Sequence, residues 1–220
     1  MTATPSPAAA AAALSFTVED AARVEHAVVP TLGFAVRVTA GGGAAIRSVL
    51  LDTQIQIAAR RRRYDAAAEE KLFEVFGAPA GWGSALRTLP WMRVTSVVPP
   101  FTGSTLVDIQ VPCSYDLHVV ASRYFDALED GDVPLEFLFS GTVFAAGPGG
   151  MLQATRISWE TDAEYRFPVA LWQETMERYF RGTAWVRLRK EAFDRLAAYK
   201  SREALPTWEE AIESLLERAP

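Results

Sequence analysis

The pattern of apolar and polar positions in residues 133–159 predicts the central hairpin of the fold. In its first half, apolar side chains recur at every second position, at Val133, Leu135, Phe137, Phe139 and Val143. This period of two is typical of a half-buried strand. Residues 147–150, Gly-Pro-Gly-Gly, supply a turn, because glycine accepts positive φ and proline pre-sets a turn dihedral. We therefore expect two antiparallel strands, 133–146 and 151–159.

Two earlier segments, 32–39 and 46–58, also alternate between apolar and polar residues. A run of three glycines, residues 41–43, separates them, and we expect a turn there that makes the two strands hairpin partners. Because the alternating face of each strand needs a partner layer, all four predicted strands should share one core.

Capping signals and period-3.6 patterns predict helices in the rest of the chain. Asp65 precedes an apolar stripe that stops at Gly77, which predicts a helix of roughly three turns. The pattern of residues 114–131 is ambiguous. It predicts an extended conformation at Leu117 and Val119 and a helical turn after them. A further helix should start at Pro168, with an apolar stripe formed by Val169, Trp172, Met176 and Tyr179.

The last two predicted helices lie close to the C-terminus. Phe193, Leu196 and Ala197 fall together on the first. The second begins with a capping box, Thr207 and Glu210, and its predicted buried face consists of Ile212, Leu215 and Leu216.

These elements predict an α+β fold, an antiparallel β-sandwich or strongly bent sheet with a helix after the second long strand and two to three C-terminal helices. We expect a disordered Ala/Pro-rich tail over 1–14 and a single domain over 15–220. Within that domain, the β-rich core should occupy 15–167 and the helical part 168–218.

Composition and charge exclude some classes of partner and indicate the cellular environment of the protein. The chain has 220 residues and a formal net charge of -5, so neither a nucleic acid nor an anionic membrane is an expected partner. No apolar run approaches the roughly 20 residues that span a bilayer. The N-terminal alanines lack the basic residues of a signal peptide before Arg23, and Cys113 is the only cysteine. We expect a soluble cytoplasmic protein without membrane insertion.

The supply of catalytic and metal-binding side chains is small. Cys113, His26 and His118 are too few for a closed zinc, iron or nickel site. No nucleophile or phosphate-binding motif is present, so we predict no metal, no cofactor and no catalytic residues. Carboxylates that could approach one another across a sheet are interpreted as solvated strand residues, at Asp108, Asp116, Glu136 and Glu160.

The candidate partner-binding residues are an arginine run and two tryptophans. Arg60, Arg61, Arg62 and Arg63 form either a patch for an acidic partner or a solvated edge partly neutralised by Glu69 and Glu70, and we favour the second interpretation. Trp82 and Trp91 lie in irregular or short segments. Tryptophan is enriched in binding hot spots, although burial in the core explains most tryptophans.

Several stretches resemble an uncharacterised actinobacterial family, a domain of unknown function. The resemblance runs from about Leu32 to the C-terminus and is carried by SVLLDTQIQI, VFGAPAGWGSALRTLPW, VPPFTGST with VPCSYD, PLEFLFSGTVF and LPTWEEAIESLL. The chain departs from the pattern at 144–146. Genes of this family often neighbour those of a high-affinity nickel-iron uptake hydrogenase, which implies an accessory or assembly role. The resemblance supplies no catalytic residues.

Our first functional hypothesis is a non-enzymatic accessory protein that offers a surface to a redox-enzyme subunit or to a second copy of itself. One alternative is a small hydrolase or isomerase that uses carboxylates around Asp116 and Glu136. Another is a chaperone-like holder of apolar segments. A deep pocket lined by convergent carboxylates would favour the enzyme, and an exposed apolar groove would favour a binding protein.

Overall fold

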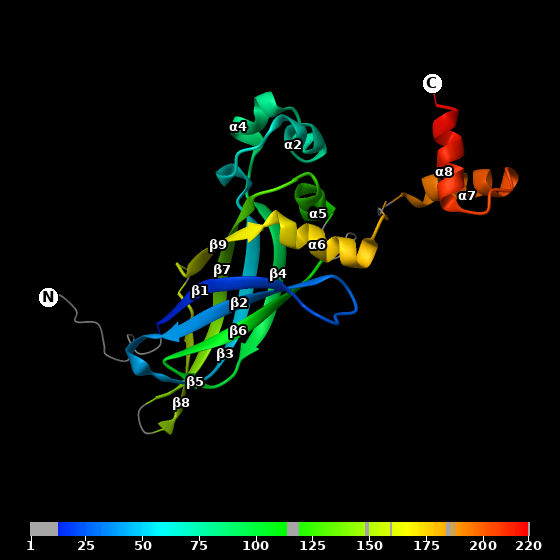
Figure 1. The fold of residues 1–220 in the computed structure, drawn as a ribbon. Coiled ribbons are helices and arrows are strands. Elements are labelled where there is room, and N and C mark those ends of the chain that lie inside the picture. Colours follow the sequence, from blue (N-terminus) through cyan, green and yellow to red (C-terminus); the bar gives the residue numbers. More distant parts are fainter. Residues whose placement is uncertain are drawn as a thin grey trace. The chain divides into compact units, whose positions relative to one another are not determined.

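The computed structural model describes residues 13–113, 119–147, 150–158, 160–183, 186 and 188–219. Most of the predicted N-terminal tail lies outside these residues. The chain divides into two compact units at Gly182/Thr183. Figure 1 shows the strands and the first five α-helices in one unit and the last two helices in the other. We describe each unit by itself.

The first unit contains two antiparallel sheets. The smaller sheet has the order β1-β2-β6, formed by β1 (Leu14–Arg23), β2 (Thr31–Ala40) and β6 (Ser104–Pro112). The larger sheet has the order β4-β3-β7-β8, formed by β4 (Leu89–Val98), β3 (Ala45–Ile57), β7 (Asp132–Ala146) and β8 (Leu152–Arg156). Two further strands complete it, β5 (Phe101–Thr102) beside β3 and β9 (Asp162–Pro168) beside β7.

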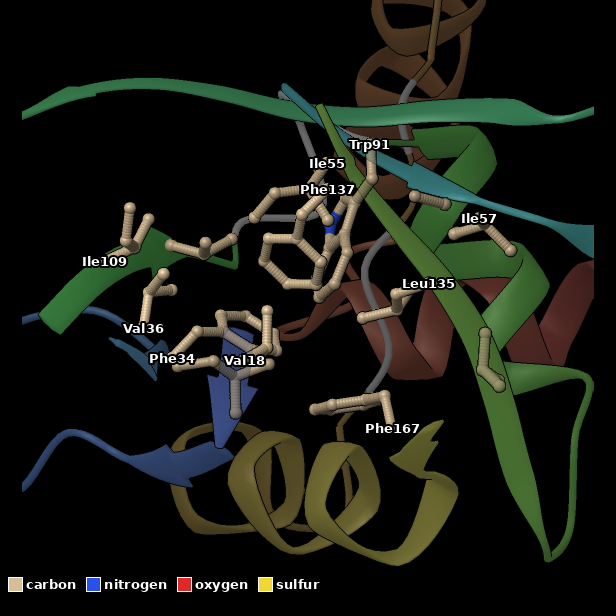
Figure 2. Close-up of a cluster of buried hydrophobic side chains, with 14 of the residues drawn as sticks. Val18, Phe34, Val36, Ile55, Ile57, Trp91, Ile109, Leu135, Phe137 and Phe167 are labelled. Carbon is tan, nitrogen blue, oxygen red and sulfur yellow. The ribbon is translucent and has the colours of Figure 1, made fainter. Parts of the chain in front are cut away.

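The core lies between the two sheets. Phe34 of β2 packs against Phe137 of β7, with ring centroids 5.2 Å apart, and both side chains are fully buried. Figure 2 shows Val18, Phe34, Val36 and Ile109 facing Ile55, Trp91 and Phe137. Alternation along each strand places these apolar residues on the inner faces. The predicted α+β sandwich is confirmed.

All four predicted strands are present, but one predicted pairing is wrong. β2 is bonded to β1 and β6, and β3 lies between β4 and β7, so residues 32–39 and 46–58 are not hairpin partners. The connection 41–43 is a 3-10 turn in which Gly42 and Gly43 have φ of +66°. It leads the chain from one sheet to the other. The two strands therefore contribute to the same core but are not hydrogen-bonded to each other.

The helices of the first unit are α2 (Ala66–Lys71), α3 (Phe73–Phe76), α4 (Trp82–Ala85), α5 (Val119–Asp126) and α6 (Val169–Phe180). Asp65 caps α2 as predicted, because its Oδ1 accepts a 2.8 Å hydrogen bond from the Ala68 backbone N–H. The single predicted helix is interrupted at Leu72. Val119, expected to be extended, begins α5, and Leu117 lies outside the described residues.

Three side chains of the predicted α6 stripe, Val169, Trp172 and Met176, are buried. The Trp172 indole N–H also donates a 2.8 Å hydrogen bond to Asp126 Oδ1, which joins α6 to the end of α5. α6 therefore belongs with the sheets, although the sequence analysis places it in the C-terminal helical part. The prediction of one domain over 15–220 stays a prediction.

The second unit contains α7 (Lys190–Arg202) and α8 (Trp208–Glu217). The predicted cap of α8 is present, since Thr207 Oγ1 accepts a 3.1 Å hydrogen bond from the Glu210 backbone N–H. In the described part of the chain, no helix has both the length and the apolarity needed to cross a membrane.

Candidate protein-binding surface

The second unit displays an apolar groove of about 810 Å³. We call it the helical groove, and its apolar walls are Val186, Leu188, Phe193, Leu196, Trp208, Ile212, Leu215 and Leu216. Among the described residues, Lys190 is the one charged residue that lines it. The sequence analysis expects Ile212, Leu215 and Leu216 to be buried, but they are exposed, and Leu216 keeps 67% of its surface accessible. Within this unit, the described residues therefore leave the periodic apolar pattern uncovered.

Contacts of a small, a polar and an aromatic kind join α7 to α8. Ala211 is fully buried, and the hydroxyls of Tyr199 and Ser214 share a 2.7 Å hydrogen bond. The Phe193 and Trp208 rings lie 5.3 Å apart, and the Lys200 ammonium sits 5.4 Å from the Trp208 ring centroid. Beside these contacts, the larger aliphatic side chains of the groove remain exposed, at Leu188, Ile212, Leu215 and Leu216.

The two helices of the groove carry opposite net charge. α7 has four basic and two acidic residues, whereas α8 has four glutamates and no basic residue. None of the α8 glutamates makes an ion pair with another described residue. The groove is thus an apolar surface between a basic helix and an acidic helix.

The arginine run is divided between two roles. The Arg61 guanidinium donates two hydrogen bonds to the Glu164 carboxylate, at 2.6 and 2.7 Å, and lies 3.5 Å from Glu136. These contacts lower the pKa of Glu164 below its usual value. Glu69 and Glu70, which the sequence analysis expects to neutralise the run, form no ion pair with any described residue.

Arg62 stabilises a neighbouring turn through hydrogen bonds. Its two terminal nitrogens donate to the carbonyl oxygens of Asp130 and Asp132, at 2.6 and 2.7 Å. By contrast, the side chains of Arg60 and Arg63 are exposed and make no hydrogen bond or ion pair within the described residues. Of the arginine run, only Arg60 and Arg63 remain available to an acidic partner. Binding of such a partner stays a prediction.

Trp82 and Trp91 are core residues. Trp82 donates a 2.9 Å hydrogen bond to the Gly77 carbonyl and packs against Tyr64 and Phe76. Trp91 is 3% exposed and packs against Phe125, with ring centroids 4.9 Å apart. Their large apolar rings fill the end of the sandwich covered by helices, so they are not part of a contact surface on the folded chain.

The carboxylates named in the sequence analysis do not gather at one place. Asp108 lies on the outer face of the smaller sheet, and Glu136 lies on the outer face of the larger one, beside Arg61. The core separates these two faces. Glu160 is exposed in the turn before β9, and Asp116 lies outside the described residues.

Cys113 is buried at the end of β6 and donates a 3.3 Å hydrogen bond to the Val111 carbonyl. Burial raises the pKa of its thiol to about 12. His118 lies outside the described residues, and these residues contain no group of three His, Cys, Asp or Glu side chains placed to hold a metal ion.

We expect native Cys113 to resist thiol reagents at pH 8. The thiolate is the reactive form, and a pKa near 12 leaves almost none of it at that pH. Ellman's reagent should release no colour from the native protein over minutes, and one equivalent after unfolding in urea. Because the chain has one cysteine, the signal reports this residue alone. Rapid stoichiometric reaction of the native protein would contradict its burial.

Three solved structures show distant similarity to this chain. A late embryogenesis abundant (LEA) protein has a TM-score of 0.32 and 15% identity, over 74% of this chain and 75% of that chain. A beta-glucosidase from Kluyveromyces marxianus has a TM-score of 0.25 and 13% identity, over 70% of this chain but only 15% of that enzyme. The ApaA protein from Bordetella pertussis has a TM-score of 0.24 and 13% identity, over 71% of this chain and 94% of that chain.

No curated protein matches the chain. A family described as of unknown function, DUF6084, matches residues 11–220. Because this match extends over both compact units, the chain belongs to the DUF6084 family.

Proposed function

We propose that the protein is a non-enzymatic accessory protein that binds another protein through the helical groove. The observation that carries this proposal is the apolar surface of α7 and α8, whose large side chains repeat at helical spacing and are exposed within their own unit. Exposed apolar patches rimmed by charge mark protein-interaction sites. Burial of such surface contributes about 25 cal/mol for each Å² removed from water.

The shape of the groove supports a polypeptide ligand. Leu188, Leu196 and Ile212 offer aliphatic contacts, and Trp208 adds an aromatic ring of the kind enriched in binding hot spots. An amphipathic helix can place its apolar face in such a groove, with anchors spaced three and four residues apart. Lys190 and the α8 glutamates would then form the polar rim that surrounds a protein interface.

We further propose that the partner is a subunit of a redox enzyme in the cytoplasm of an actinobacterium. Support comes from the resemblance noted in the sequence analysis, whose family genes often neighbour those of a nickel-iron uptake hydrogenase. The hydrogenase is therefore the first partner to test.

Leu215→Glu should strongly weaken binding to this partner. The substitution places a charge in the apolar wall of the groove, where binding would have to desolvate it. With purified nickel-iron hydrogenase immobilised on a sensor, we expect the dissociation constant to rise by roughly thirty-fold or more, the effect of losing one hot-spot contact.

The matched control is Ala198→Glu, which adds the same charge to an exposed position of α7 that does not line the groove. It should bind as the unaltered chain does, and both variants should keep the same circular dichroism spectrum. If the unaltered chain does not bind hydrogenase, or if Leu215→Glu binds equally well, the proposed partner or the proposed surface is wrong.

A further inference from the structure

We propose that a second copy of this chain covers the helical groove when no other protein does, so that the protein is a homodimer joined through α7 and α8. This proposal rests on the proposed function in one respect, because it takes the groove to be a protein-binding surface. It adds the identity of an occupant and the way in which the two copies recognise each other.

The size of the second unit is the first argument. Thr183–Pro220 is a unit of fewer than 40 residues that buries little of its own apolar surface. Below about 40 residues, a chain usually needs a disulfide, a metal or oligomerisation to be stable. The only cysteine of the chain is Cys113, outside this unit, and the unit contains no histidine. Association with a second polypeptide surface would bury the apolar side chains that the unit itself leaves exposed.

Charge complementarity is the second argument, and it favours a second copy. A two-fold axis makes the same patch face itself, so a residue of one copy meets a different residue of the other in two symmetric contacts. If basic α7 of one copy lies beside acidic α8 of the other, each copy supplies the charge that its partner lacks. The unpaired glutamates of α8 thereby gain cationic neighbours at the rim of the interface.

Such rim charges chiefly select the partner and its orientation, while the apolar groove supplies most of the affinity. Lys190 lines the groove on α7, and Glu213 is exposed on α8 near Ile212 and Leu216. Lys190 pairs with Asp194 of its own helix, whereas Glu213 forms no ion pair with a described residue, and we choose these two residues for a charge-exchange test.

Sedimentation equilibrium of the full chain tests the dimer directly. The chain has a mass of 24.1 kDa, and we expect a concentration-dependent species of twice that mass. Leu215→Glu should raise the dimer dissociation constant by roughly thirty-fold or more, and Ala198→Glu should leave it unchanged. A monomer at every concentration, or a dimer that survives Leu215→Glu, would overturn the proposal.

The charge exchange tests the pairing of α7 with α8. Lys190→Glu and Glu213→Lys should each weaken the homodimer, because each places like charges across the interface. An equimolar mixture of the two variants should recover the affinity of the unaltered chain, because both contacts are then of opposite charge. Weakening that the mixture does not reverse would overturn this pairing.

The two proposals fail separately. A chain that is monomeric but still binds hydrogenase through Leu215 would refute the homodimer and leave the proposed function in place. A dimer that Leu215→Glu dissociates, but that never binds hydrogenase, would refute the redox partner and leave the homodimer in place.

Discussion

Gly141→Ala is expected to destabilise the fold by roughly 2 to 6 kcal/mol, the sum of a strained backbone and an overpacked core. Gly141 lies in β7 opposite Leu51 and has a φ of +138°, which residues with a Cβ rarely adopt. A Cβ built there would lie 2.0 Å from the Leu50 carbonyl oxygen. The neighbouring strand would have to move, since the obstacle is backbone.

Urea unfolding followed by circular dichroism should measure this loss. Gly83→Ala is the control, because its φ is not in the left-handed region and no atom lies within 4 Å of the added Cβ. We expect its unfolding midpoint to stay close to that of the unaltered chain. A Gly141→Ala midpoint as high as that of the control would show that β3 and β7 do not approach as closely as described.

Phe137→Ala is expected to cost roughly 3 to 5 kcal/mol, the usual result of removing a fully buried ring. Phe137 has no accessible surface and packs against Phe34 and Phe139 across and along the sheets. Its loss should leave a cavity at the centre of the sandwich. The thermal midpoint should fall accordingly when it is followed by near-ultraviolet circular dichroism or by calorimetry.

Phe73→Ala makes the same chemical change at a ring that is 59% exposed. It should lower the midpoint far less, because little buried surface is lost. Equal effects of the two substitutions, or an unchanged midpoint for Phe137→Ala, would contradict the position of the core.

Local patterns predict the elements well but not their partners. Alternation along 133–146 identifies β7 because the period of side chains in a strand is fixed by its geometry. The same alternation does not show whether β3 pairs with β2 or with β7, since both strands have apolar inner faces. Three glycines permit a hairpin turn and also the sheet-to-sheet connection that the structure contains.

For the candidate site, too, the sequence predicts the helices but not what contacts them. The stripe of Ile212, Leu215 and Leu216 is visible in the sequence, but a stripe only shows that a helix face seeks apolar contact. It does not show whether the contact lies within the chain. Trp82 and Trp91 are ambiguous for the opposite reason, because tryptophan suits both cores and interfaces. The burial of Trp91 also depends on helices distant in sequence, α5 and α6.

The order of the strands has a consequence for how the chain acquires its structure. The strands of the two sheets are interleaved along the chain. β2 pairs with β6 about seventy residues later, and β3 pairs with β7 about ninety residues later. Such non-local pairing must overcome a loop-closure cost before it gains stabilising contacts, which slows folding to the range of milliseconds to seconds. During synthesis, neither sheet can be completed from an uninterrupted early part of the chain. The larger sheet is completed only by β9, so the apolar inner face of the smaller sheet stays without a full partner layer until about residue 168 has left the ribosome.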